Sequence, residues 1–464
     1  MYPYSSNRYY SKQIASDYFN TTVGYGKSDT RPLYYVHLDP QYEAGLRSQL
    51  ELYAKAGGDA ITVTVVEDAW STQTPDVYPS MVKWKKNSDG TWSFDYTDLD
   101  YWVNLNLEYG IDSQIKSFSL SPWGGRITYY DEANDEVICE SVKTGGDRWK
   151  ELYTIFLTDY MQHMEEKGWF DITYLAMDEL SLSQVQPVID LVHSIQNEDG
   201  ESFKISLAAN SYEAEAAFDY LDDISLASSL LSRDDVIAHR NEVGLFTTFY
   251  TCGGGYGAMA NPPGHSAFAV YTAYKHNVKG YLRWALDSFN AEPYETGANQ
   301  LFVDGDLYLI YPDARDSDAM QAKSSPRFEK FIEGMREVEK LKYLEAEHAW
   351  LKDEIQQLHD NIASSYSASF MQEFKANINA LSKKAVKGEP IVGIHFDEDE
   401  VELYVDEQQT LTYTTYPLDL IESSNNQQIW LSDNENITFI GGWSPDPTGA
   451  WTSAKLDQLT SKGY

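Results

Sequence analysis

The sequence predicts an α/β fold, a (β/α)8 barrel followed by helices and a small all-β domain. Three observations lead to this prediction. Short apolar runs rich in β-branched residues alternate with helical patterns from about residue 31 to residue 320. Runs such as Ile61 to Val66 lack polar alternation, which is typical of parallel strands covered on both faces. From Ile391 the apolar period changes to two, which indicates a separate β domain.

Eight strands and the helices between them account for the first part of the chain. The strands are expected at 33–38, 61–66, 111–118, 172–177, 203–207, 224–226, 244–250 and 281–284. Helices are expected at 40–56, 98–109, 147–168, from about 183 and at 267–276, with Asp147 as an N-cap. Asp306 to Tyr311 is one further strand-like run. Eight strands that alternate with helices form the pattern of a (β/α)8 barrel.

The remaining boundaries follow from changes of composition and period. Residues 1–30 read as an irregular lead-in, 31–320 as the barrel and 321–388 as a helical extension with helices at 325–344 and 345–384. Residues 389–464 read as the β domain, and we expect it to be truncated.

Composition excludes several classes of function. The formal net charge is -37, from 72 acidic and 35 basic residues, which opposes binding to nucleic acid or to an anionic membrane. No apolar run of membrane-spanning length and no signal peptide is recognisable, so we expect no membrane insertion. Cys139 and Cys252 form no disulfide framework, and no spacing of ligands predicts a metal or a cofactor. Aromatic residues make up 14% of the chain and suit sugar faces.

Asp178 and Glu179 are the candidate catalytic residues. They directly follow the apolar run Ile172 to Met177. Because an ionised carboxylate is costly to bury without a partner, two in succession indicate a polar, water-filled cleft at the end of a strand. The alternative is that one of them caps the helix that starts near Ser183. The loops after the strands are long, and active sites of such barrels lie on that side.

The same loops and strand ends supply candidate substrate-binding residues. A hairpin is expected to turn at residues 87–90, between Trp84 and Trp92. The glycine-rich stretch 253–255 lacks the motif of a phosphate-binding loop, so a substrate loop is the better interpretation. The candidates for substrate binding are Trp70, Gln73, Trp123, Asn210, Tyr250, Trp284 and Tyr311.

Six fragments in this order resemble family 123 glycoside hydrolases and their DUF4091 relatives. They are Trp70 to Thr74, Ser80 to Trp84, Ser121 to Trp123, Met177 to Glu179, Gly280 to Trp284, and Arg327 to Glu329 continuing through Tyr343-Leu344. The resemblance spans residues 33–345. It implies a (β/α)8 barrel and retaining N-acetyl-β-galactosaminidase activity that uses an adjacent Asp-Glu pair and the substrate's own 2-acetamido group.

The C-terminal part resembles a group 2 bacterial immunoglobulin-like module. The likeness rests on Val405 to Leu411 and Ile429 to Asp433. Together with the first resemblance, it implies a bacterial protein that is extracellular or on the cell surface. The expected partner is a glycan that contains an N-acetylhexosamine, and the oligomeric state stays open.

The adjacency of the two acids suits this chemistry. A retaining glycosidase with a protein nucleophile needs two carboxylates about 5 Å apart across the anomeric carbon, which neighbours in sequence do not easily provide. If the acetamido oxygen attacks instead, Glu179 acts as general acid and then base, while ionised Asp178 orients the acetamido N–H. One alternative is a non-acetylated glycan, with Asp68, Glu67 or Asp287 opposing Glu179. Another is a glycan-binding surface protein without activity.

Overall fold

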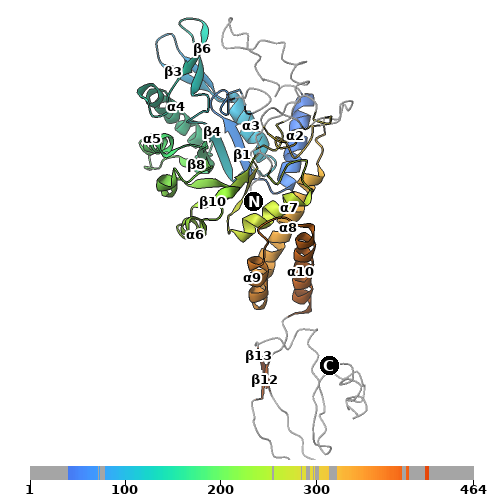
Figure 1. Ribbon diagram of the computed structural model, residues 1–464. Coiled ribbons are helices and arrows are strands. Elements are labelled where there is room, and N and C mark those ends of the chain that lie inside the picture. Colours follow the sequence, from blue (N-terminus) through green and yellow to red (C-terminus); the bar gives the residue numbers. More distant parts are fainter. Residues whose placement is uncertain are drawn as a thin grey trace, which may run out of the picture. The chain divides into compact units, whose positions relative to one another are not determined.

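The computed structural model describes residues 40–71, 73, 79–252, 255–283, 285–288, 293–295, 297, 302–312, 321–388, 393–396 and 413–416. It divides into two compact units, Met1–Lys340 with Leu358–Phe374, and Leu341–Gln357 with Lys375–Tyr464. Each unit is described separately below. The first contains the sheet and the helices that surround it (Figure 1).

Seven parallel strands form the main sheet, in the order β1-β4-β7-β8-β9-β10-β11. Their bounds are β1 Ala60–Thr64, β4 Gln114–Phe118, β7 Thr173–Asp178, β8 Lys204–Ala209, β9 Asp223–Ala227, β10 Phe246–Thr251 and β11 Gly280–Arg283. These are seven of the eight predicted strands. The eighth, at 33–38, lies outside the described residues.

Two contacts show that the sheet is curled. The Tyr250 hydroxyl on β10 bonds to Glu179 after β7, and Lys116 on β4 bonds to Asp223 on β9. Each pair of strands is three places apart in the sheet. In a flat sheet with strands about 4.8 Å apart, they would be separated by roughly 14 Å. The sheet therefore forms a half-barrel with a concave inner face.

Helices follow most of the strands and lie around the outside of the sheet (Figure 1). They are α2 Pro40–Lys55, α3 Thr97–Leu107, α4 Asp147–Glu166, α5 Leu182–His193, α6 Asp234–Glu242 and α7 Gly264–Lys275. Short 3-10 helices lie at Phe170–Ile172, Glu215–Tyr220 and Ser228–Leu230. In α4 the predicted apolar face, from Leu152 to Met164, is buried, and Gly168 ends the turn that follows at φ 72°.

A second, four-stranded sheet is built from the loops that follow β1 and β4. Its order is β3-β2-β5-β6, with β2 Lys83–Lys86, β3 Trp92–Asp95, β5 Arg126–Asp131 and β6 Glu136–Ser141. The predicted hairpin is confirmed, since Lys86 pairs with Trp92 across residues 87–91. The β5–β6 hairpin was not expected, because its strand residues are largely polar and half-exposed.

Two local predictions were wrong. Gly146, and not Asp147, occupies the N-cap of α4, so Asp147 is the first helical residue. The run 306–311 is no strand: it begins in a turn and pairs through isolated bridges, Asp287 with Tyr308 and Tyr311 with Lys323. Its apolar residues are buried, as in a strand, but they pack in an irregular segment.

The C-terminal helices are α8 Pro326–Glu347, the 3-10 helix Ala349–Leu351, α9 Lys352–Asp360 and α10 Ala368–Lys387. The predicted helix 325–344 is confirmed as α8, but the predicted helix 345–384 was wrong as one element, because this range is divided into shorter helices. Of the predicted β domain, the structure describes one antiparallel pair, β12 Gly393–Phe396 and β13 Tyr413–Tyr416. The rest of the predicted module lies outside the described residues.

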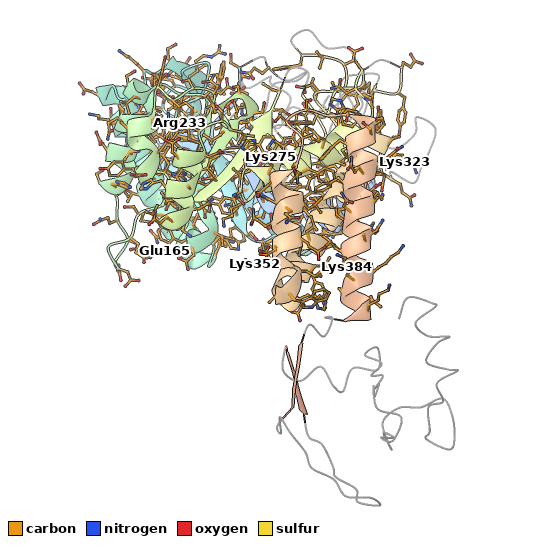
Figure 2. All side chains as sticks on the ribbon, turned by 60° about the horizontal axis from the view of Figure 1, so that its bottom comes forward. Glu165, Arg233, Lys275, Lys323, Lys352 and Lys384 are labelled. Carbon is orange, nitrogen blue, oxygen red and sulfur yellow. The ribbon has the colours of Figure 1, made fainter. Side chains whose placement is uncertain are left out.

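Side chains fill the space between the sheet and its helices (Figure 2). The core includes Trp84, Trp149, Tyr153 and Phe156, which form a connected aromatic cluster. In the part of the chain that is described, no helix has the length and apolarity needed to cross a bilayer.

Candidate active site

Asp178 is the last residue of β7, and Glu179 follows it at the carboxyl edge of the sheet. Asp178 lies opposite Ala208 of β8, and the Glu179 amide donates to the Ala208 carbonyl at 2.8 Å. Neighbours in a regular strand point to opposite faces. Glu179 has a φ of 51°, a left-handed conformation that is uncommon for a residue with a side chain. This break in the strand directs both carboxyl groups to the same edge, and such strained residues cluster at functional sites.

Neither acid is needed as a helix cap. The N-cap of α5 is Ser181, whose amide donates to the Gln184 side chain at 3.3 Å in a capping box. The capping alternative is therefore excluded for this pair.

The Glu179 carboxyl group is held by donors from two other strands. Asn210 Nδ2, just after β8, donates to Oε2 at 3.0 Å. The hydroxyl of Tyr250, on β10, donates to Oε1. Burial, the bond to Glu179 and the nearby acids raise the pKa of Tyr250 above its ordinary value, so the phenol stays protonated as a donor. Both residues were predicted to bind substrate, and both contact the proposed general acid.

Asp178 has a different environment. Burial and the adjacent Glu179 charge raise its pKa to about 7, although a hydrogen bond from the Trp123 side chain acts in the opposite direction. Because two like charges lie side by side in a partly buried place, the pair in the free protein can hold a proton near neutral pH. The ionised state of Asp178 in a substrate complex stays a prediction.

Sequence reasoning missed the groups that surround the pair. Cys252 is exposed one residue after β10, and partial desolvation followed by the charges of Glu179 and Asp306 raises its pKa to about 11. Buried Arg283, at the end of β11, pairs with Asp306 at 3.0 Å and donates to the Thr251 carbonyl at 3.1 Å. Their positions at the ends of two predicted strands were the available signal.

The other predicted substrate-binding residues differ in their surroundings. Trp123 is 47% exposed, which leaves its ring open to a ligand beside Asp178. Trp70 is buried against Phe118, with ring centroids 4.9 Å apart. Gln73 is half-buried, and Tyr311 lines a separate cavity that is described below. Trp284 lies outside the described residues.

Among the described residues, no group of three or more His, Cys, Asp or Glu side chains is arranged to hold a metal ion. What the site offers is proton transfer between two acids with different surroundings, beside an exposed aromatic ring.

Comparisons with known proteins agree with this geometry. The model of the glycoside hydrolase 123 catalytic domain matches residues 35–344, about two thirds of the chain. A solved family 123 glycoside hydrolase from Clostridium perfringens, described in terms of glycolipid glycan hydrolysis, is 34% identical with a TM-score of 0.70. That match covers 76% of this chain and 66% of the solved chain, so this chain spans just under two thirds of its relative.

Two other structural matches are too distant to carry an argument. A GH113 β-1,4-mannanase has 11% identity and a TM-score of 0.35, covering 63% of this chain and 93% of its own. An endo-β-1,4-mannanase from Thermotoga petrophila has 12% identity and a TM-score of 0.36, covering 66% and 75%. No curated protein matches the chain. The family match over residues 35–344 nevertheless shows that the chain belongs to glycoside hydrolase family 123.

Proposed function

We propose that the protein is a retaining β-N-acetylgalactosaminidase-like enzyme that uses the 2-acetamido group of its substrate as the nucleophile. The observation that carries this proposal is the unequal environment of two adjacent acids. Glu179 is held by Asn210 and Tyr250, whereas Asp178 is poorly hydrated and lies beside the exposed ring of Trp123. One acid is thus placed for proton transfer and the other for binding a neutral donor such as an amide N–H.

Substrate binding would redistribute the proton of the pair. An acetamido N–H that donates to Asp178 favours the ionised carboxylate, because a hydrogen bond to the charged form lowers a pKa. The proton then resides on Glu179, which can give it to the glycosidic oxygen. The acetamido oxygen forms a bond to the anomeric carbon as the bond to the leaving group breaks.

The second half of the reaction reverses these roles. Glu179 removes a proton from water, the water oxygen bonds to the anomeric carbon, and the bond to the acetamido oxygen breaks. Asp178 stabilises the positive charge of the oxazolinium-like intermediate between the two steps. No further carboxylate is required.

The three carboxylates that could serve as a protein nucleophile have different surroundings. Asp287 is 3% exposed and forms a backbone bridge with Tyr308. The Asp68 carboxylate pairs with Arg126 at 3.3 Å. Glu67 is half-buried just after β1 and is the carboxylate to examine if a plain glycoside proves to be a substrate.

A panel of 4-nitrophenyl glycosides tests the proposal. The β-N-acetylgalactosaminide should be hydrolysed, and the β-galactoside and β-glucoside should barely react. A thiazoline derived from N-acetylgalactosamine should inhibit strongly, since it mimics the cyclic intermediate. Because the related structure concerns glycolipid glycans, an oligosaccharide of that class is the natural substrate to test next.

The role of Asp178 has its own test. The Asp178→Asn variant should lose on the order of a hundredfold or more in rate on the acetamido substrate, because the charge that stabilises the intermediate is removed. It should also bind the thiazoline weakly. Efficient hydrolysis of a plain galactoside, with a covalent glycosyl adduct on another carboxylate, would falsify the mechanism.

We also infer that residues 33–38 add an eighth strand to the half-barrel and that residues 389–464 form an immunoglobulin-like module. The parallel order β1 to β11 and the antiparallel β12–β13 pair support these inferences. Deletion after Gly388 should leave a folded enzyme with unchanged kcat/KM, since the module has its own strand pattern.

A further inference from the structure

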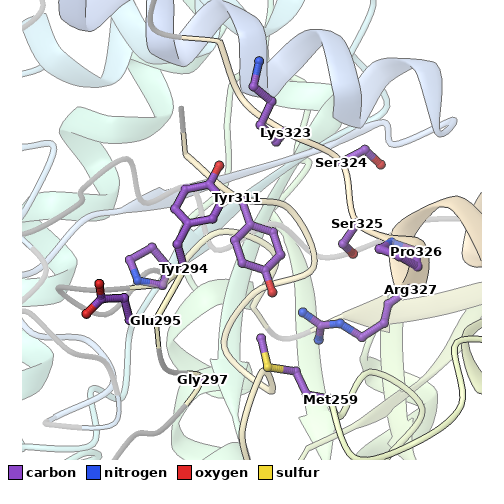
Figure 3. A pocket seen from close by; sticks show the side chains of 11 residues that line it. Met259, Tyr294, Glu295, Gly297, Tyr311, Lys323, Ser324, Ser325, Pro326 and Arg327 are labelled. Carbon is purple, nitrogen blue, oxygen red and sulfur yellow. The ribbon is translucent and has the colours of Figure 1, made fainter. Parts of the chain in front are cut away.

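A second group of side chains lines a cavity of about 430 Å³. It is formed by segments that follow β10 and β11 and by the start of α8, and none of its residues belongs to the Asp178–Glu179 site. The lining residues used below are Tyr294, Glu295, Tyr311 and Arg327. Figure 3 shows them around the opening.

Arg327 is the unusual member of this group. It is 6% exposed, and its Nη1 donates to the carbonyls of Gly257 and Gly305, the latter at 2.8 Å. Its Nη2 is buried without a hydrogen-bond partner. Among the described residues the guanidinium interacts with the Tyr311 side chain but pairs with no carboxylate. Arg283, which is fully buried, is paired with Asp306. A buried cation without a counterion is costly, so an anion at this place would be stabilised.

The start of helix α8 adds positive potential to the same wall. Ser324, Ser325 and Pro326 line the cavity, and the helix extends from Pro326 to Glu347. The Ser325 hydroxyl already accepts the Phe328 amide at 3.2 Å. The helix dipole favours a negative charge at such an end, and in Figure 3 the Arg327 side chain points from it toward Tyr311.

The opposite wall presents aromatic rings. The rings of Tyr294 and Tyr311 lie 5.2 Å apart between centroids and are inclined by 36°. Tyr294 is 44% exposed, so part of its ring is available to a ligand. Exposed Glu295 lies on the other side of this pair from Arg327 (Figure 3). Aromatic rings suit the faces of a sugar.

We propose that this cavity binds an acidic sugar, with its carboxylate at the Arg327 guanidinium and its ring against Tyr294 and Tyr311. Arg327 is suited to this task because its planar donors can bind a carboxylate through two parallel bonds. The proposal concerns recognition and is independent of the substrate-assisted mechanism. It adds a sugar-acid specificity to an enzyme with a large negative charge, which would otherwise repel such ligands.

Isothermal titration calorimetry with glucuronate and with glucose tests the proposal, in a buffer with little chloride. The Glu179→Gln variant serves as the background protein, so that turnover is absent. Glucuronate should bind, and glucose should bind at least tenfold more weakly. In the Arg327→Gln variant the affinity for glucuronate should fall about tenfold or more, whereas that for glucose should change little.

Two further variants test the proposal even if the Arg327→Gln protein unfolds. Glu295→Gln alters an exposed residue and should tighten glucuronate binding about twofold or more, because a like charge is removed from the cavity. Lys330→Gln, one turn further along α8 and outside the cavity lining, removes the same charge and should change nothing. Absence of glucuronate binding, equal binding by Arg327→Gln, or weaker binding by Glu295→Gln would overturn the proposal.

Discussion

Two charged clusters occupy the inner face of the same half-barrel, and they are opposite in kind. Toward the amino ends of the strands, Lys116 pairs with Asp223, the first residue of β9, and Ser206 donates to the same carboxylate at 2.8 Å. Toward the carboxyl ends, Asp178 and Glu179 place two like charges side by side. The first cluster is sealed from water, with side chains 4% and 0% exposed.

This difference in charge indicates that the lower cluster stabilises the fold and that the upper pair takes part in chemistry. Burial lowers the pKa of Lys116 to about 7, whereas the bonded Asp223 carboxylate favours the charged ammonium. The lower cluster therefore pairs opposite charges and contributes to the fold. Burial and, after it, the adjacent like charge of Glu179 raise the pKa of Asp178 to about 7, so the upper pair can hold and release a proton near pH 7. Barrels of this class place catalysis at the carboxyl ends and stability at the amino ends.

The largest effect should come from the Glu179→Gln substitution. We expect loss of roughly 10² to 10⁴ in kcat on a glycoside with a poor leaving group, because the proton donor is removed. A 4-nitrophenyl substrate should lose much less, since its leaving group needs little protonation. Steady-state rates on the two substrate types measure this difference, and equal losses would count against a general-acid role.

The lower cluster should respond in the opposite way. Lys116→Met leaves Asp223 buried without its cation, and we expect about 3 to 5 kcal/mol lower stability. In the double variant with Asp223→Asn, much of that loss should return. Urea unfolding measures both, and kcat of whatever protein stays folded should be near that of the wild type. A catalytic defect in a stable Lys116→Met protein would contradict a purely structural role for the lower cluster.

The sequence predicts the strands and the paired acids better than it predicts the contacts between distant strands. The strands and the pair at 178 and 179 follow from local apolar patterns, and seven of the strands are confirmed. Register and curvature bring Lys116 to Asp223 and Tyr250 to Glu179, and no local pattern specifies either contact. For the same reason, no local pattern indicated that Tyr311 lines another cavity, or that burial beside Glu179 raises the pKa of Asp178.

The pH dependence of kcat/KM sharpens the contrast further. The pair must carry one proton to protonate a leaving group, so activity should fall by about tenfold per unit as the pH rises above about 7. The Trp123 bond favours ionised Asp178. In Trp123→Phe the midpoint of this limb should therefore move to higher pH, whatever happens to the absolute rate. An unchanged midpoint would mean that Trp123 does not interact with the group that titrates.

The smallest predicted effect concerns stability and uses the same carboxyl group. Asp178 has a raised pKa when folded and an ordinary one, about 4, when unfolded. Below pH 4 both states are protonated and the group has no effect. Between pH 4 and 7 only the unfolded state releases its proton, so the stability of the folded protein falls as the pH rises. Above pH 7 the full cost of the buried charge is present.

The Asp178→Asn substitution removes that cost. Its melting temperature should match that of the wild type near pH 4.5 and exceed it by on the order of a few degrees at pH 8. Thermal unfolding at the two pH values measures the difference. Lys116→Met, which removes one partner of the buried ion pair, should be destabilised at both pH values. A pH-independent gain for Asp178→Asn would mean that repacking, and not charge, is responsible.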